Sequence, residues 1–264
     1  INQQQIRFST LEEFFTLSQE SERDFEYTVA WVDCLGSSDQ LKGIFIRGNH
    51  VKNQEQENPG RDPLFRKGLQ PHRESSWKSV PIFLPNITLN PLSIRAFNTF
   101  YYAKNVRKIQ SSRVHYDPFF YPLDSLLNWN RIYGKRGFLQ YQCVVPYHQD
   151  NGTAISEIFK TIKQSNLGSF LAVLKTFGNI QSPGSLSFPM EGVTLALDFP
   201  NYGNHLFSML TRCDDIVQAA GGRVYPAKDA RMSKKHFHAF FPQARSFQQW
   251  MDPAFESDFW RRVS

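Results

Sequence analysis

The stretch of residues 186–231 constrains the fold of this chain more than any other part of its sequence. Over 193–199 large apolar residues alternate with smaller or polar ones, which is the period of a strand with one buried face. Apolar residues then recur at helical spacing over 204–220, and a pair of glycines ends that helix. A short strand over 223–225 follows, and Lys228 comes just past its end. The stretch therefore predicts a strand, a helix and a strand that together present a single cation.

The segments just before this stretch extend the same pattern. Residues 138–145 alternate as a strand, 153–166 repeat as an amphipathic helix, and 170–177 alternate as another strand. Joined to the elements above, they give the order β-α-β-β-α-β, which is typical of a split βαβ or ferredoxin-like unit. We therefore expect a ferredoxin-like unit in the C-terminal half of the chain.

The first part of the chain resembles a second helix-and-strands unit, although no strict sequence repeat relates the two. Capping residues and apolar periodicity predict helices over 9–21 and 90–104. Alternation predicts strands over 25–34 and 43–51, with a further candidate over 106–115, and composition predicts a long polar loop over 53–77. The fold class that follows is α+β, with one broad, mostly antiparallel sheet and helices on one face.

Composition narrows the range of functions. The 264 residues carry a net charge of only +6, and the basic residues are scattered, so nucleic-acid binding is disfavoured. The three cysteines lie far apart in apolar segments and are expected to be buried free thiols, and the histidines lack the spacing of a metal site. No apolar run is long enough for a transmembrane segment, and no signal peptide is evident. We expect a cytoplasmic or periplasmic location, with peripheral attachment to a membrane left open.

Several polar side chains interrupt neighbouring apolar strands. They are Gln140, Gln142, Lys175, Thr194 and Asp198. One interpretation is a solvated sheet face, and the other is a wall that binds substrate. Amides and a cation suit hydroxyl-rich ligands, which need paired donors and acceptors, and the apolar loop over 119–123 would have little reason to cover a plain wet surface. The adjacent pair Asp214 and Asp215, by contrast, is interpreted as a surface pair on a helix.

Dense motifs in the second half resemble the C-terminal half of FAD-linked oxidases of the vanillyl-alcohol oxidase type. They are Trp129-Asn130-Arg131-x-Tyr133-Gly134, Gly137-Phe138-Leu139-Gln140-Tyr141-Gln142, Leu186-Ser187-Phe188-Pro189, Asp198-Phe199-Pro200, Gly221-Gly222-Arg223-x-Tyr225-x-Ala227-Lys228-Asp229-x-Arg231, and the segment from Phe241-Pro242 to Arg261-Arg262. Within that family the resemblance is strongest to decaprenylphosphoryl-ribose oxidases and weaker to arabinonolactone and gulonolactone oxidases. It covers most of residues 116–263, whereas residues 1–115 match only in general pattern.

The resemblance implies a domain organisation. Residues 1–222 would form a substrate-binding (cap) domain, and 223–264 would be a C-terminal segment returning to an FAD domain. That FAD-binding domain would lie upstream of Ile1, and FAD would be bound mainly by it. We expect the present chain alone not to hold FAD, because it shows no phosphate-binding loop of its own, and we expect residues 229–241 to be open or disordered.

The resemblance also implies roles for individual residues. Lys228 matches the family's motif lysine near flavin and substrate, and is expected to be catalytic and cofactor-binding. The substrate-binding positions implied are Gln140, Gln142, Lys175, Phe120, Tyr121, Thr194 and Ala196. Ala196 falls beside the flavin, where the decaprenylphosphoryl-ribose oxidases have a cysteine. Phe120 and Thr194 replace a tyrosine and an asparagine of those enzymes. These three differences leave the substrate open between a sugar, a polyprenyl-phosphate sugar and a sugar lactone.

Two functions remain in view. The first is an FAD-dependent oxidoreductase acting on a CH–OH group, of which this chain supplies the substrate domain. Here a cation near the reduced flavin would stabilise negative charge, and two amides would orient hydroxyl groups. The second is a non-catalytic ferredoxin-like module that binds a glycan or a protein.

Overall fold

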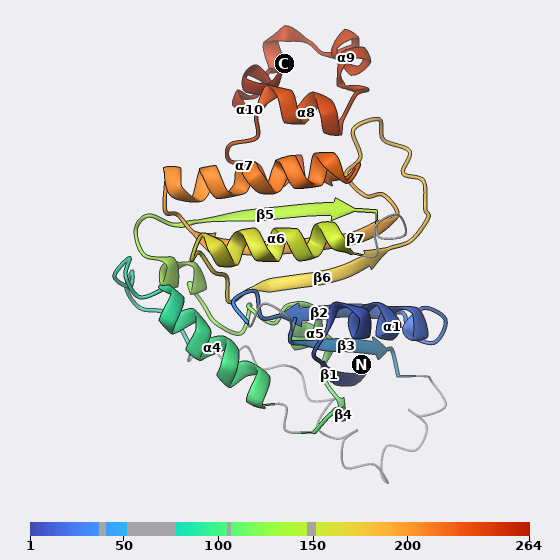
Figure 1. Ribbon diagram of the computed structural model, residues 1–264, viewed down its shortest axis with the longest axis vertical. Helices are drawn as coiled ribbons and strands as arrows, with labels where there is room; N and C mark the ends of the chain where they lie inside the picture. Colours follow the sequence, from blue (N-terminus) through green and yellow to red (C-terminus); the bar gives the residue numbers. More distant parts are fainter. Residues whose placement is uncertain (37–40, 52–77, 105–106, 147–151) are drawn as a thin grey trace. The chain divides into compact units, whose positions relative to one another are not determined.

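The computed structural model describes residues 1–36, 41–51, 78–104, 107–146 and 152–264. It divides into two compact units, Ile1–Gly137 and Phe138–Ser264. The polar loop predicted over 53–77 lies outside the described residues. Figure 1 shows the elements of each unit along the chain.

The second unit has the predicted order of elements. Its strands are β5 (Phe138–Val145), β6 (Ala172–Phe177), β7 (Gly192–Pro200) and β8 (Arg223–Val224), and its main helices are α6 (Thr153–Gln164) and α7 (Asn204–Ala219). The strands lie in the order β6-β7-β5-β8, and each adjacent pair is antiparallel. Because β7 lies between β5 and β6, this is the split βαβ arrangement, and the ferredoxin-like prediction is confirmed.

One face of this sheet forms the core of the second unit. Tyr141 and Cys143 of β5, with Leu195 and Leu197 of β7, are buried on it. Figure 1 shows α6 and α7 lying along the same side of β5, β6 and β7. Both helices bury an apolar stripe there, and Ile155, Ile158, Ile162, Leu206 and Met209 are fully buried. Burying such a side chain contributes about 1.5–3 kcal/mol, so this face holds the unit together.

The first unit repeats the order of elements. Its strands are β1 (Asn2–Phe8), β2 (Tyr27–Val32), β3 (Gly43–Asn49) and β4 (Ile109–Arg113), and its main helices are α1 (Leu11–Ser21) and α4 (Pro91–Lys104). They lie in the order β4-β1-β3-β2 with antiparallel pairing, which is the same split βαβ arrangement. The α+β, antiparallel fold class is therefore confirmed, and the two units are topological counterparts.

Helices in the first unit contact both faces of its sheet. Phe14 of α1 packs against Phe8 and Phe45, with ring centroids 6.0 and 6.1 Å away. Neighbouring side chains along a strand point to opposite faces, so Arg7 and Trp31 belong to the other face. Their partners come from α4: the Trp31 and Tyr101 rings are 4.8 Å apart, and the guanidinium of Arg7 lies 4.1 Å from the Tyr102 ring. The expectation of helices on one face thus describes the second unit, and α4 departs from it.

The C-terminal part of the second unit is compact. It contains the short turn η2 (Pro226–Lys228) and the helices α8 (Lys234–Phe240), α9 (Ala244–Phe247) and α10 (Asp258–Val263), with short 3-10 turns at Gln248–Trp250 and Pro253–Phe255. Phe237 of α8 is buried and contacts the rings of Phe241, Phe259 and Trp260. The expectation that residues 229–241 are open or disordered is therefore wrong, because α8 has an apolar side that packs on its neighbours.

A buried charge network joins this C-terminal part to α7. The carboxylate of Asp214 is fully buried and pairs with Arg231 at 2.7 Å, and His236 lies 3.7 Å away. The other ring nitrogen of His236 contacts Asp215 at 2.9 Å. The interpretation of Asp214 and Asp215 as a surface pair is thus wrong for Asp214, since Arg231 and His236, which contact it, come from a later segment of the chain.

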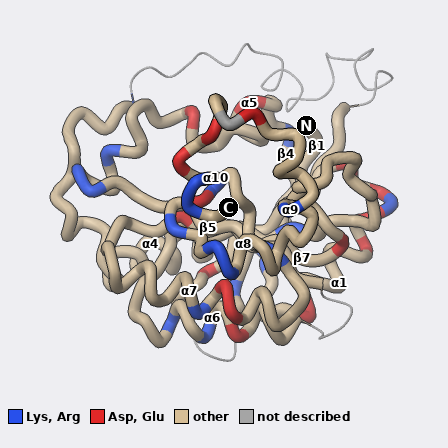
Figure 2. The backbone as a smooth tube through the Cα atoms, turned by 90° about the horizontal axis from the view of Figure 1, so that it is seen from above, with Lys and Arg blue, Asp and Glu red and all other residues tan. Residues whose placement is uncertain are grey.

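Two further expectations concern the cysteines and transmembrane segments. All three cysteines are buried and free, as predicted. Among the described helices, none combines the length and the apolar character that crossing a bilayer requires. Figure 2 shows basic and acidic positions interspersed along the elements of the second unit.

Candidate functional site

The face of the second sheet that α6 and α7 leave free carries the polar residues singled out in the sequence. Directly paired residues in an antiparallel sheet point to the same face. In this register Gln140 pairs with Asp198, Gln142 with Ala196, and Lys175 with Thr194. These six residues, from three adjacent strands, are called the polar face below. The structure thus brings together five of the predicted site residues and adds Asp198 to them.

Two hydrogen bonds across β5 and β7 fix the amides of the polar face. The Nε2 of Gln140 donates to Oδ1 of Asp198 at 2.8 Å, and the Nε2 of Gln142 donates to Oγ1 of Thr194 at 3.2 Å. Each amide therefore uses one of its two N–H donors within the sheet. Among the described residues, neither side-chain carbonyl oxygen accepts a hydrogen bond, so both oxygens are free to accept one from a ligand hydroxyl.

The electrostatic character of the polar face comes largely from Asp198. Asp198 is only 2% exposed, and this burial raises the pKa of its carboxyl to about 6. The hydrogen bond from Gln140 and the charge of Lys228 lower this pKa but do not cancel the effect of burial. Ser169 contributes a further polar contact, because its hydroxyl accepts from the backbone N–H of Asp198. A carboxylate in such surroundings costs stability, which marks it as a candidate functional group.

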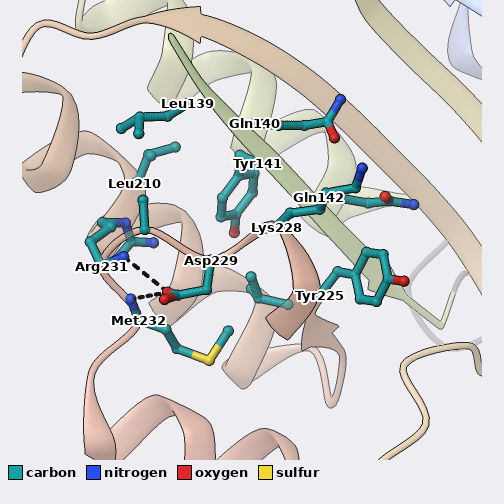
Figure 3. Close-up of a pocket in the computed structure, with 12 residues that line it drawn as sticks. Leu139, Gln140, Tyr141, Gln142, Leu210, Tyr225, Lys228, Asp229, Arg231 and Met232 are labelled. Carbon is teal, nitrogen blue, oxygen red and sulfur yellow. Dashed lines mark hydrogen bonds between the residues drawn. The ribbon is translucent and has the colours of Figure 1, made fainter. Parts of the chain in front are cut away.

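Lys228 reaches this face from η2. The backbone of Tyr225 extends the pairing of β8, since its N–H donates to the carbonyl of Gln142 at 2.8 Å, and η2 follows directly. Figure 3 shows the side chains of Gln140, Gln142 and Lys228 extending to one side of the strand, while Tyr141 points to the other. Lys228 is exposed, and no ion pair to it occurs within the described part of the chain. Its ammonium is therefore available to a ligand.

The turn after Lys228 is held by side chains rather than by a sheet. Oδ1 of Asp229 accepts from the backbone N–H groups of Arg231 and Met232. Its other carboxylate oxygen accepts from Arg262 of α10, and Arg262 also donates to the carbonyl of Met232. This arrangement fixes the direction in which η2 leaves β8, and so the position from which Lys228 extends.

A small pocket opens beside these residues. It is lined by Leu139, Gln140, Tyr141, Gln142, Leu210, Val224, Tyr225, Lys228, Asp229, Ala230, Arg231 and Met232. Its cavity volume of about 20 Å³ suffices for a water molecule and not for a sugar ring. A ligand larger than water would have to lie against the exposed side of the polar face and not inside this pocket.

Aromatic side chains close one end of the polar face. The ring of Phe188 stacks on Tyr225 with centroids 4.6 Å apart and meets Phe177 edge-on at 6.2 Å. Arg223 supports the same loop by donating to the carbonyl of Ser187 at 2.9 Å. Phe188 lies in the Leu186–Pro189 motif, so this motif supplies an apolar boundary to the polar face.

The remaining predicted site residues lie in the first unit. Phe120 ends the short helix α5 (Tyr116–Phe120), and Tyr121 follows it. The ring of Phe120 contacts Tyr27 at 4.9 Å, and both Phe120 and Tyr121 are exposed. Their place at the edge of a pocket with Lys228 stays a prediction.

Asp198 is the site residue that sequence reasoning left out of its substrate-binding set. The sequence marks it only as a polar residue in an apolar strand. Its role becomes evident from the strand register, which pairs it with Gln140. Strand register depends on pairing between segments 58 positions apart, which local periodicity does not report.

The fold and the polar face define a ferredoxin-like module that presents two hydrogen-bond acceptors and a cation on its free sheet face. The chain is 34% identical to decaprenylphosphoryl-β-D-ribose oxidase of Mycolicibacterium smegmatis over 265 residues, which cover 93% of this chain. It is also 32% identical, over 48% of its length, to an uncharacterised protein in the mprA 5′ region of Streptomyces coelicolor. The resemblance to decaprenylphosphoryl-ribose oxidases is therefore confirmed.

These similarities have limited extent. The chain spans about half of the Mycolicibacterium oxidase (53%) and about a third of the Streptomyces protein (35%). No protein-family model matches the chain. The solved structure of FgChi7B aligns with 100% of this chain and 55% of its own, at 10% identity and a TM-score of 0.46, a level of similarity from which no relationship follows.

Proposed function

We propose that this chain is the substrate domain of an FAD-dependent oxidoreductase that oxidises a CH–OH group of a sugar, a polyprenyl-phosphate sugar or a sugar lactone. One observation carries the proposal. The chain is similar along 93% of its length to an enzyme named for oxidising a polyprenyl-phosphate ribose, and its free sheet face holds the acceptors and the cation that such chemistry needs.

The residues of the polar face fit a flavin and a sugar together. Gln140 and Gln142 offer carbonyl oxygens, which suit the hydroxyl groups of a sugar. Lys228 offers an unpaired ammonium at the edge of the same face, where negative charge would be stabilised. Ala196 lies between Gln142 and β6 and adds no bulk, which leaves room for a flat ring system to approach.

In the proposed reaction each residue has one task. FAD, when bound, would accept the hydride from the carbinol carbon of the sugar. Gln140 and Gln142 would orient the sugar by accepting hydrogen bonds from two of its hydroxyl groups. Lys228 would hold negative charge at the edge of the polar face, and Lys175 would contact polar groups of the substrate from β6. Thr194 would contact the amide of Gln142 through its hydroxyl.

We further propose that the flavin is bound chiefly by a domain upstream of Ile1, and that residues 1–222 and 223–264 act as cap domain and returning segment. The coverage of the Mycolicibacterium oxidase supports this, since nearly half of that enzyme has no counterpart in the present chain. Within the described residues no glycine-rich turn cradles a phosphate, and the pocket near Lys228 is far too small for a dinucleotide. Phe120 and Tyr121 would border the substrate from the first unit.

The test uses the full-length protein purified from its natural host. The expected result is a yellow protein whose flavin absorbance bleaches on anaerobic mixing with a polyprenyl-phosphate ribose or a sugar lactone. A colourless protein that nevertheless binds a glycan would contradict the proposal and favour a non-catalytic glycan- or protein-binding module. Calorimetric titration of the 264-residue chain with FAD should give no saturable heat, whereas tight binding would overturn the assignment of the flavin to another domain.

A further inference from the structure

We propose that Asp198 is the positioning residue of the polar face: its carboxylate holds the amide nitrogen of Gln140, so that the carbonyl oxygen of Gln140 accepts a hydrogen bond from a ligand hydroxyl. The inference deepens the proposed function and rests on it for the identity of the ligand. Asp198 lies beside Gln140 on the neighbouring strand, is itself buried, and does not need to touch the substrate.

The chemistry of the pair leaves only one orientation for the amide. An ionised carboxylate can accept hydrogen bonds and cannot donate them, so the amide group that faces it must be the NH2. Turning the amide around would set its carbonyl oxygen 2.8 Å from a negative oxygen, which is strongly unfavourable at a residue only 2% exposed. Asp198 therefore fixes Gln140 as a hydrogen-bond acceptor toward the free side of the sheet.

Gln142 provides the contrast within the same strand. Its partner is the hydroxyl of Thr194, which can either donate or accept. The amide of Gln142 can consequently turn around and offer its NH2 to a ligand at little cost. The polar face thus holds one fixed acceptor at Gln140 and one adaptable group at Gln142. The carbonyl oxygen of Gln140 therefore takes a hydroxyl or another donor of the ligand, whereas at Gln142 the carbonyl oxygen and the NH2 group can exchange places.

The protonation state of Asp198 controls this arrangement. The charged groups on the same side of the sheet are Lys175 from β6, Arg223 from β8 and Lys228 from η2, and of these Lys228 acts on Asp198. Burial nevertheless raises the pKa of the carboxyl to about 6. Below that pH the protonated carboxyl can donate to the Gln140 oxygen, and the amide is no longer fixed. Recognition of the donor hydroxyl should weaken as the pH falls through about 6.

The direct test observes the amides themselves. The full-length protein is prepared with isotope-labelled glutamine side chains, and the amide signals are assigned with Gln140→Met and Gln142→Met variants. The Gln140 amide signals should shift with a midpoint near pH 6, and the Gln142 signals should shift much less. Asp198→Asn should abolish the Gln140 transition, while Asp258→Asn, at an exposed side chain, should leave it unchanged. Gln140 signals that stay constant across this pH in the wild-type protein would overturn the inference.

Substrate analogues provide the second readout. Replacing the hydroxyl that reaches Gln140 by fluorine removes the donor, so KM should rise about tenfold for wild-type protein and much less for Asp198→Asn, with kcat changed little. The same KM penalty in both proteins would contradict the positioning role. The amide titration depends on Asp198 and Gln140 alone. Its failure therefore overturns this inference whatever the reaction, whereas an intact titration without flavin reduction overturns only the proposed function.

Discussion

The two units have the same order of strands and helices and differ in what lies on their second sheet face. In the first unit that face is occupied by aromatic side chains. Tyr101 of α4 contacts Trp31, and Phe119 and Phe120 of α5 contact Tyr27. In the second unit the equivalent side holds Gln140, Gln142 and Lys175, and the rings of Phe177, Phe188 and Tyr225 lie at one end of it. One topology can therefore serve as a packed support or as a binding surface.

Individual residues account for the difference. Gly48 of β3 has no side chain, and a Cβ there would lie 3.0 Å from the ring of Phe119, so the glycine allows α5 to pack closely. In the second unit the free face of β5 and β7 carries Gln140, Gln142 and Asp198, whose polar groups would lose hydration under an apolar cover. The side chains of the strands thus decide whether a face is covered from within the chain or left for a ligand.

The largest expected effect concerns the apolar core between α1 and the sheet of the first unit. Phe14→Ala removes the ring of α1 that meets Phe8 and Phe45, and Phe14 is fully buried. The free energy of unfolding should fall by about 3–5 kcal/mol in denaturant titrations. Phe120→Ala, at a more exposed ring of the same unit, serves as the control and should cost much less. Equal losses would show that the first unit is not organised around its α1 face.

The second prediction tests the role of Lys228 in the proposed reaction. Lys228→Ala in the full-length protein should slow flavin reduction about a hundredfold, corresponding to about 3 kcal/mol, with folding and FAD content unchanged. Lys228→Arg should recover little, because a planar guanidinium does not replace a compact ammonium. Stopped-flow measurements on both variants, beside the surface variant Lys235→Ala, provide the check. Reduction at the wild-type rate in Lys228→Ala would remove the central residue of the proposed site.

The third prediction concerns the pH dependence of stability that Asp198 causes. The folded-state pKa of Asp198 is raised to about 6, so the native state binds an extra proton between that pH and the ordinary pKa of 3.8. Wild-type stability therefore falls as pH rises through this window and stays reduced above it. Asp198→Asn has no carboxyl to deprotonate, so it should be more stable than wild type by about 3 kcal/mol at neutral pH. Thermal unfolding of both proteins should converge below about pH 4; a variant less stable than wild type at neutral pH would refute this account.

The smallest effect concerns the adaptable amide. Gln142→Ala should raise the apparent KM by about threefold to tenfold and leave unfolding within about 0.5 kcal/mol of wild type. Steady-state kinetics with denaturant titration on the same preparation would separate the two. A loss of stability as large as that of a core substitution would mean that the polar face contributes to packing, as in the first unit.

Sequence periodicity predicted the second unit almost completely, because its strands and helices each bury one apolar side. It missed β1, since Asn2 to Gln5 are polar on both faces and pair with other polar residues, such as Arg47 and Ser112. It misjudged Asp214 because the residues that neutralise it, Arg231 and His236, come from elements beyond α7. The site residues followed from a family resemblance, whereas the role of Asp198 depends on strand register, which only the paired sheet reveals.

The tie between Asp229 and Arg262 has a consequence for synthesis of the protein. The turn that carries Lys228 is fixed by a side chain 33 positions further along the chain. Because the chain is synthesised from its N-terminus, β5 and β8 are made before Arg262 and can pair before the residue that anchors the turn is present. We expect the polar face to form first, and the turn that carries Lys228 to be fixed only once α10 has folded.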